Sequence, residues 1–194
     1  WGGQVDLLGD VPVDGTNLVM RAVTRLREAA GVTSGAAIHL IKRIPSAAGL
    51  GGASSDAAAS LLAANQAWQL GWPRTKLAQL AAELGSDIPF FFSDGAAICR
   101  GRGEKVESLA SAATLHVVVV RPPGGLSTAD VFERCSPAEH PDCVQPLVAS
   151  LRCGDMALTG RRMVNRLEPA ASELTSWIGR LRNAFEHLDC LGHQ

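Results

Sequence analysis

The order of apolar and polar positions predicts helices over much of the chain. Over residues 17–30 the apolar side chains recur every three or four positions, which places them on one face of a helix. Thr16 or Asp14 is expected to cap its start, and Gly31 stands where a helix commonly ends in a left-handed glycine. Further helices are expected at residues 55–70, 76–84, 155–167 and 170–188.

Shorter runs have the patterns of β-strands. In residues 36–44, Ile38 and Leu40 fall on one face of an extended chain and His39 on the other. Other strands, joined by glycine turns, are expected at residues 90–92, 96–100, 105–109 and 115–120. This mixture of helices and short strands predicts an α+β fold.

Prolines mark a change of pattern after residue 120. Little continuous structure is expected in the stretch that they punctuate, at Pro122, Pro123, Pro137, Pro141 and Pro146. We therefore predict a domain boundary near residue 125. The first domain would span residues 1–125, and residues 126–194 would begin a largely helical second domain.

Charge and composition limit the classes of function. Lys and Arg number 18 against 19 Asp and Glu, so the net charge is −1, which argues against broad electrostatic binding to nucleic acid or anionic membranes. No run approaches the roughly 20 apolar residues of a membrane-spanning helix. The five cysteines form no Cys-x-x-Cys pair and no secretory signal is visible, so we expect reduced thiols in a cytoplasmic protein.

The segment PSAAGLGGASSD, residues 45–56, carries the strongest functional signal. Its three glycines allow positive φ and close approach of a ligand to the backbone. The helix expected after it would offer unpaired N–H groups and the positive end of its dipole, which suit a phosphate. A tight turn that binds nothing would need fewer glycines. Ser54 and Ser55 could add hydroxyl donors or reach a metal ion that bridges phosphates.

Two common phosphate-binding motifs do not fit this loop. No lysine follows the glycines as in a Walker loop, and Ser54 stands where a dinucleotide fingerprint needs glycine. Residues 45–54 instead match the signature Pro-x-x-x-Gly-Leu-Gly/Ser-Gly/Ser-x-Ser, and the chain resembles the GHMP kinases. Within that superfamily it is most similar to the 4-diphosphocytidyl-2-C-methyl-D-erythritol kinases. The similar segments are Asn17-Leu18 and residues 44–58, 84–91 and 101–104.

The resemblance implies a fold and an activity. The fold would be the two-domain α+β architecture of GHMP kinases, with a first domain like domain 2 of ribosomal protein S5 and an incomplete second domain. The reaction would be ATP-dependent phosphorylation of the 2-hydroxyl of 4-diphosphocytidyl-2-C-methyl-D-erythritol, a step of the non-mevalonate route to isoprenoid precursors. ATP and Mg²⁺ would be required, and the partner would be this small molecule, with no nucleic acid and no membrane.

The resemblance also gives individual residues roles. Asp87 matches the catalytic aspartate; without the resemblance it would be read as a turn residue, although a carboxylate there could accept a proton from an attacking hydroxyl. Ser55 is a candidate ligand for Mg²⁺. The nucleotide-binding positions would be Asn17, Leu18, Lys42, Pro45, Ala47, Ala48, Gly49, Leu50, Gly51, Gly52, Ala53, Ser54 and Ser55. The substrate-binding positions would be the backbone of Arg102 and the side chains of Thr128 and Phe132.

Three parts of the family pattern do not occur in these 194 residues: a lysine signature, a Gly-Tyr-His segment and a Gly-Ser/Thr-Gly loop. We therefore expect the chain to be the middle of the enzyme, poorly active by itself. Two alternatives remain: another GHMP kinase that acts on a different small alcohol, and a noncatalytic remnant that binds ATP. A nucleic-acid module of the S5 type is disfavoured by the net charge of −1.

Overall fold

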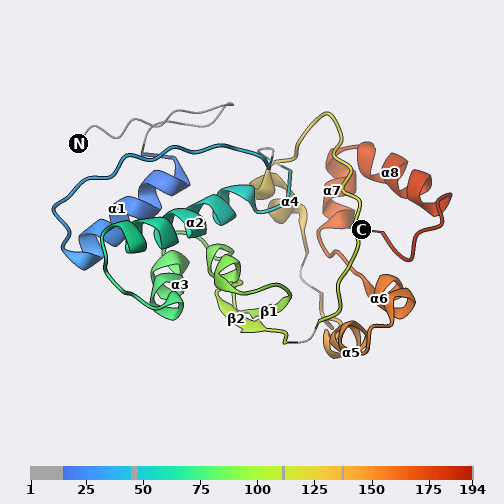
Figure 1. The fold of residues 1–194 in the computed structure, drawn as a ribbon. Helices are drawn as coiled ribbons and strands as arrows, with labels where there is room; N and C mark the ends of the chain where they lie inside the picture. The colour runs from blue at the N-terminus through green and yellow to red at the C-terminus, as the bar shows by residue number, and fades with distance from the viewer. Residues whose placement is uncertain (1–14, 45–47, 111, 137, 194) are drawn as a thin grey trace. The chain divides into compact units, whose positions relative to one another are not determined.

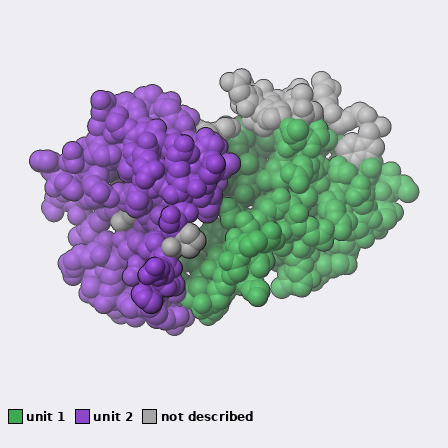
Figure 2. Space-filling view, turned by 180° about the vertical axis from the view of Figure 1, so that it is seen from behind, with its two compact units in different colours: residues 1–109 green, residues 110–194 purple. Residues whose placement is uncertain are grey.

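The computed structural model describes residues 15–44, 48–110, 112–136 and 138–193. The chain divides into two compact units, residues 1–109 and 110–194, which are coloured separately in Figure 2. Among the described residues, no helix has the length and apolar character needed to cross a membrane. The assignment of residues 1–125 and 126–194 to two family domains stays a prediction.

The first helix, α1 (Leu18–Ala30), forms where the apolar stripe predicts it. Its cap is Asn17 rather than Thr16 or Asp14, because the Asn17 side-chain oxygen accepts a hydrogen bond from the N–H of Val19 at 2.9 Å. Asp14 lies outside the described residues. Gly31 ends the helix with φ +65°, as predicted.

Helices α2 (Gly52–Ala67) and α3 (Arg74–Ala82) and the 3₁₀ helix η1 (Ile88–Phe92) complete the core of the first unit (Figure 1). α1 packs along α2, and η1 contacts both α2 and α3. The largest buried apolar side chains, one or two from each of these elements, are Val23, Leu26, Leu61, Leu77 and Ile88. The prediction of a strand at residues 90–92 is wrong, because Pro89 favours a helical start and Ile88 and Phe92 are buried at helical spacing.

A β-hairpin follows η1. Strands β1 (Ala97–Arg100) and β2 (Lys105–Ser108) pair antiparallel with Arg100 opposite Lys105, so residues 101–104 form the turn. These strands were expected at 96–100 and 105–109. The strands expected at 36–44 and 115–120 do not form, because no described segment pairs with them along a ladder; Leu40 makes a single bridge.

The described part of the second unit is helical. Little continuous structure was expected among the prolines, and most described residues there are irregular; the exceptions are a helix of 7 residues capped by Ser127 and the start of another, whose first turn holds Pro146. The helix expected at 155–167 ends early, and Thr175 and Ser176 divide the one expected at 170–188. The helices among the described residues of this unit are α4 (Thr128–Arg134), α5 (Gln145–Cys153), α6 (Met156–Arg162), α7 (Glu168–Leu174) and α8 (Trp177–Glu186).

Candidate phosphate-transfer site

The glycine loop leads directly into α2. Gly49 and Gly51 have φ of +70° and +64°, in the left-handed region that glycine adopts without strain. Gly51 is the N-cap of α2, so the helix begins at Gly52, three residues before the predicted start. No side chain of the described residues caps this end. The first N–H groups of α2, together with its dipole, therefore form a place that favours an anion.

Two glycines of this loop are needed because other side chains lie against them. A Cβ on Gly51 would come within 2.7 Å of Phe91 Cζ, and a Cβ on Gly52 within 2.9 Å of Ile44 Cγ2. Phe91 belongs to η1, so η1 packs directly on the loop. The backbone at the start of α2 therefore lies between the side chain of Phe91, in η1, and the side chain of Ile44.

We expect Gly51→Ala to lower the free energy of unfolding by about 2 kcal/mol, the sum of left-handed strain and overlap with Phe91. Gly31→Ala is the matched control, because Gly31 has φ +65° and nothing within 4 Å of its Cβ position. It should cost about 1 kcal/mol. Urea unfolding of the two variants measures the difference. Equal losses would show that Phe91 does not restrict the loop.

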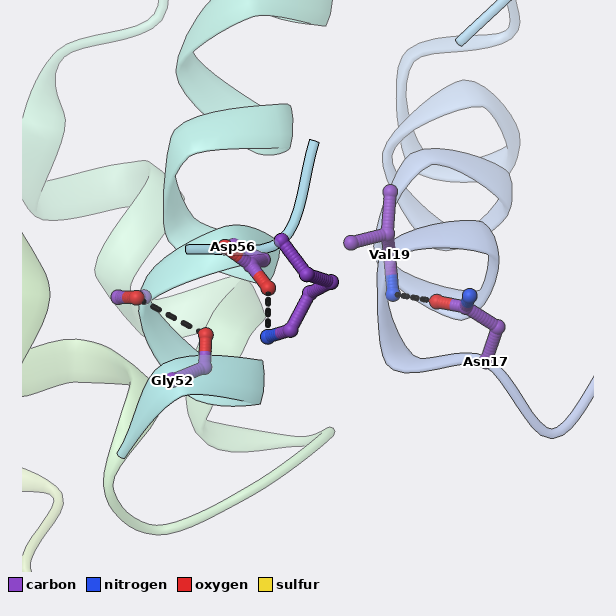
Figure 3. A network of polar contacts seen from close by, with 6 residues as sticks. Asn17, Val19, Gly52 and Asp56 are labelled. Atoms are coloured by element: carbon purple, nitrogen blue, oxygen red, sulfur yellow. Dashed lines mark hydrogen bonds and ion pairs between the residues drawn. The ribbon is translucent and has the colours of Figure 1, made fainter. Parts of the chain in front are cut away.

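Lys42 lies beside the start of α2 and forms an ion pair with Asp56 (Figure 3). The two side chains are only 11% and 23% exposed. The Lys42 ammonium lies 3.4 Å from the Cβ position of Gly52, so its charge is next to the free end of the helix. Lys42 was predicted as a nucleotide-binding residue; Asp56 was missed. Asp56 is the last residue of the glycine-rich segment 45–56. Its ion pair with Lys42, however, forms only when the chain folds, so the sequence pattern does not reveal it.

The two serines of the loop differ in their described contacts. The Ser55 hydroxyl donates to the carbonyl of Gly52 at 2.9 Å, which leaves its oxygen lone pairs available to a cation. Ser54 is half-buried in the first turn of α2. No group of three or more His, Cys, Asp and Glu side chains that could hold a metal ion occurs among the described residues.

The other expected nucleotide residues lie mostly on the first unit. Asn17 is buried at the start of α1, and Leu18 packs against the core. In the loop, Leu50 and Ala53 are exposed and Ala48 is half-buried. Pro45 and Ala47 lie outside the described residues.

Asp87 caps η1 at the end that faces the β-hairpin turn. It is exposed, and its Oδ1 accepts a hydrogen bond from the Ser86 hydroxyl at 3.2 Å. The backbone of Gly103 lies against it, since a Cβ there would be 3.3 Å from Asp87 Oδ1. Because η1 also carries Phe91, one short element links Asp87 to the glycine loop.

The turn at residues 101–104 is organised by Glu104. Its Oε2 accepts a hydrogen bond from the N–H of Arg102 at 2.8 Å. Hydrogen bonds from the backbone N–H groups of Glu104 and Arg102 lower the pKa of this carboxyl below its ordinary value, and the charges of Arg102 and Lys105 lower it further. The N–H of Arg102, an expected substrate-binding residue, is thus occupied within the turn.

We expect the amide proton shift of Arg102 to titrate with a midpoint below pH 4.5, the ordinary value for this carboxyl. The folded pKa lies below the unfolded one, so the contribution of Glu104 to stability is complete above about pH 4.5 and is lost as the pH falls through the folded pKa. NMR titration measures the midpoint. Glu104→Gln should abolish the step, and a step that persists in that variant would assign it to another group.

Thr128 and Phe132 lie on the second unit. Thr128 begins α4 and is exposed, and Phe132 is 59% exposed rather than part of a core. An exposed aromatic ring is available for stacking on a ligand. The structure therefore groups the loop, Lys42 and Asp87 on one unit, and places Thr128 and Phe132 on the other.

Comparison with known proteins agrees with the resemblance expected from the motifs. Residues 17–95 match the N-terminal domain of GHMP kinases. A 4-diphosphocytidyl-2-C-methyl-D-erythritol kinase of Pelotomaculum thermopropionicum is 41% identical over 185 residues, covering 94% of this chain and 64% of its own length. A chloroplastic kinase of the same name from Oryza sativa is 42% identical over 174 residues, 89% of this chain and 43% of its own. This chain thus spans less than two thirds of either relative.

Two solved structures share the fold. A crystal structure of 4-(cytidine 5'-diphospho)-2C-methyl-D-erythritol kinase superposes with a TM-score of 0.68 at 32% identity, over 93% of this chain and 65% of that one. Homoserine kinase from Cytophaga hutchinsonii superposes with a TM-score of 0.78 at 23% identity, over 98% and 68%. The second match concerns the fold alone. The expected α+β fold of GHMP kinases, with the N-terminal domain present, is confirmed.

Proposed function

We propose that this chain, which contains the N-terminal domain of the GHMP kinases at residues 17–95, belongs to an ATP-dependent kinase for 4-diphosphocytidyl-2-C-methyl-D-erythritol. The phosphate would be transferred to the 2-hydroxyl of the polyol. The observation that carries the proposal is the uncapped start of α2, with Lys42 beside it and Asp87 on the element packed against it. The identity of 41% to a kinase of that name supports the choice of substrate.

The phosphates of ATP would bind at the start of α2. The N–H groups after Gly51 and the positive end of the helix would attract them, and the glycines would let them approach the backbone. Lys42 would add a charge-assisted hydrogen bond from its ammonium. Mg²⁺ would accompany the nucleotide and neutralise the phosphate oxygens, with the Ser55 hydroxyl as the candidate protein ligand.

Asp87 would act on the acceptor alcohol. An exposed carboxylate, steadied by the Ser86 hydroxyl, can accept the proton of a substrate hydroxyl as that hydroxyl attacks the γ-phosphorus. The bond from the γ-phosphorus to the β,γ-bridging oxygen then breaks, and ADP leaves. The position of Asp87, at the start of a helix that packs on the glycine loop, supports this role over that of an ordinary turn residue.

Cytidine would be recognised by the residues assigned from the resemblance. The backbone of Arg102 would read the base through its carbonyl, since its N–H is held by Glu104, while Thr128 and Phe132 would contribute a hydroxyl and an aromatic face. The N-terminal domain would have the S5 domain 2-like form, and the second domain would be the beginning of the C-terminal domain of the family. The likeness to kinases of this name over 94% of the chain supports these assignments.

The test is transfer of the γ-phosphate from ATP to 4-diphosphocytidyl-2-C-methyl-D-erythritol by the protein as its gene encodes it. Mass spectrometry should find ADP and one phosphorylated product in equal amounts. Binding of Mg-ATP without any transfer would favour a noncatalytic ATP-binding protein. Transfer only to a different small alcohol would favour another GHMP kinase.

A further inference from the structure

Glu104 holds backbone groups of the hairpin turn at residues 101–104. Its carboxylate accepts the Arg102 N–H at 2.8 Å, and the N–H of Gly103 donates to the carbonyl of Arg100 at 3.1 Å. Gly101, with φ +72°, leaves room for this carboxylate: a Cβ there would be 2.5 Å from Glu104 Oε1. The side chain therefore turns back over its own turn.

The same turn is in contact with the segment that carries Asp87. A Cβ on Gly103, which has φ +119°, would lie 3.2 Å from the Ser86 carbonyl oxygen and 3.3 Å from Asp87 Oδ1. β2 also contacts η1. The backbone of Gly103 is thus one wall of the space around the Asp87 carboxylate.

We infer that Glu104 is a positioning residue, which holds the turn at residues 101–104 so that the backbone of Gly103 stays against Asp87. The inference rests on the proposed role of Asp87 in phosphate transfer. Two glycines with positive φ make this turn easy to deform, so a restraint from a side chain has a large effect on its order. Arg102 is exposed, so loss of the restraint frees an N–H to water and changes overall stability little.

Cys99 supplies a readout of the turn that does not depend on activity. It lies on β1 next to the turn, and partial burial together with the charge of Asp87 raises the pKa of its thiol. If the hairpin moves away from Asp87, the repulsion between the Asp87 charge and the thiolate weakens, and more of the thiol ionises at a given pH. A thiolate is the form that reacts with iodoacetamide, so alkylation of Cys99 should become faster.

The experiment compares Glu104→Ala with Glu107→Ala in the whole protein, because alanine, unlike glutamine, cannot accept the Arg102 N–H. Glu107 is the matched control, because it is an exposed carboxylate of the same hairpin that pairs with Arg100 at 3.8 Å. In Glu104→Ala we expect alkylation of Cys99 at pH 8, followed by peptide mass spectrometry, to be about threefold faster. We expect kcat to fall about tenfold, with KM for ATP within twofold of the parent. Glu107→Ala should leave both unchanged.

The outcomes separate this inference from the proposed function. An unchanged Cys99 rate in Glu104→Ala would overturn the inference, whether or not the protein is a kinase. A faster Cys99 rate with unchanged kcat would also overturn it, because the turn would then not serve Asp87. If the parent transfers no phosphate, the proposed function fails, and the Cys99 rate alone decides whether Glu104 holds the turn.

Discussion

Replacing Asp87 by asparagine should lower kcat for phosphate transfer about 10³-fold and leave the Kd for Mg-ATP within twofold. General-base catalysis contributes about 10² to 10⁴ to a rate, and the amide of asparagine cannot accept the proton. Asparagine has the same shape and can still accept the hydrogen bond from the Ser86 hydroxyl, so the fold of η1 should persist. Steady-state kinetics and calorimetric titration with Mg-ATP measure the two quantities.

The control for this variant is Asp94→Asn. Asp94 follows η1 and its exposed carboxylate pairs with Arg74 at 2.7 Å, an interaction worth at most about 1 kcal/mol at such exposure. Its loss should leave kcat unchanged. A similar loss of kcat in both variants would point to disturbance of η1 rather than to chemistry at Asp87. Full activity of Asp87→Asn would remove Asp87 from the mechanism.

Lys42→Met should weaken Mg-ATP binding by about 10- to 100-fold. A charge-assisted hydrogen bond contributes about 1.5–3 kcal/mol, and methionine keeps most of the side-chain volume without the charge. The variant should also lose about 1–2 kcal/mol of stability, because the half-buried Asp56 carboxylate would lack its ion-pair partner. Calorimetric titration and urea unfolding measure these effects separately.

A double variant distinguishes binding from stability at this ion pair. Lys42→Met combined with Asp56→Asn removes both charges, so most of the lost stability should return while Mg-ATP binding stays weak. Arg43→Met is the matched control, because it removes a positive charge from the neighbouring exposed residue. Normal binding in Lys42→Met, or weak binding in Arg43→Met, would exclude a specific contact between Lys42 and a phosphate.

Features specified by neighbouring residues were predictable from the sequence. The apolar stripe and the glycine that follows it located α1 within one residue, and the hairpin strands were located equally well. The start of α2 was placed too late, because a glycine N-cap without a capping side chain looks like loop. Residues 88–92 were misassigned because a short aromatic run does not distinguish a strand from a helical turn.

Features that depend on distant partners were not predictable. Residues 36–44 and 115–120 have strand patterns, but a strand needs a partner that the pattern does not name. Asp56 was missed for the same reason, since its partner lies 14 positions earlier and meets it only in the folded unit. The hydrogen bond of Glu104, in contrast, depends on near neighbours, because its acceptor lies only two residues from the Arg102 N–H. A carboxylate inside a turn is a local signal from which such a bond can be predicted.

The choice of substrate is tested most directly by comparing kcat/KM for 4-diphosphocytidyl-2-C-methyl-D-erythritol with that for the same polyol phosphate lacking the cytidylyl group. Groups placed to hydrogen-bond and stack on a base lose their partners when the base is removed. We predict a preference of about 10³-fold or more for the cytidylyl compound, since sites that hydrogen-bond a substrate group reject analogues lacking it by about 10⁴- to 10⁵-fold. Equal values for the two compounds would contradict recognition of cytidine and would favour a GHMP kinase with another alcohol as its substrate.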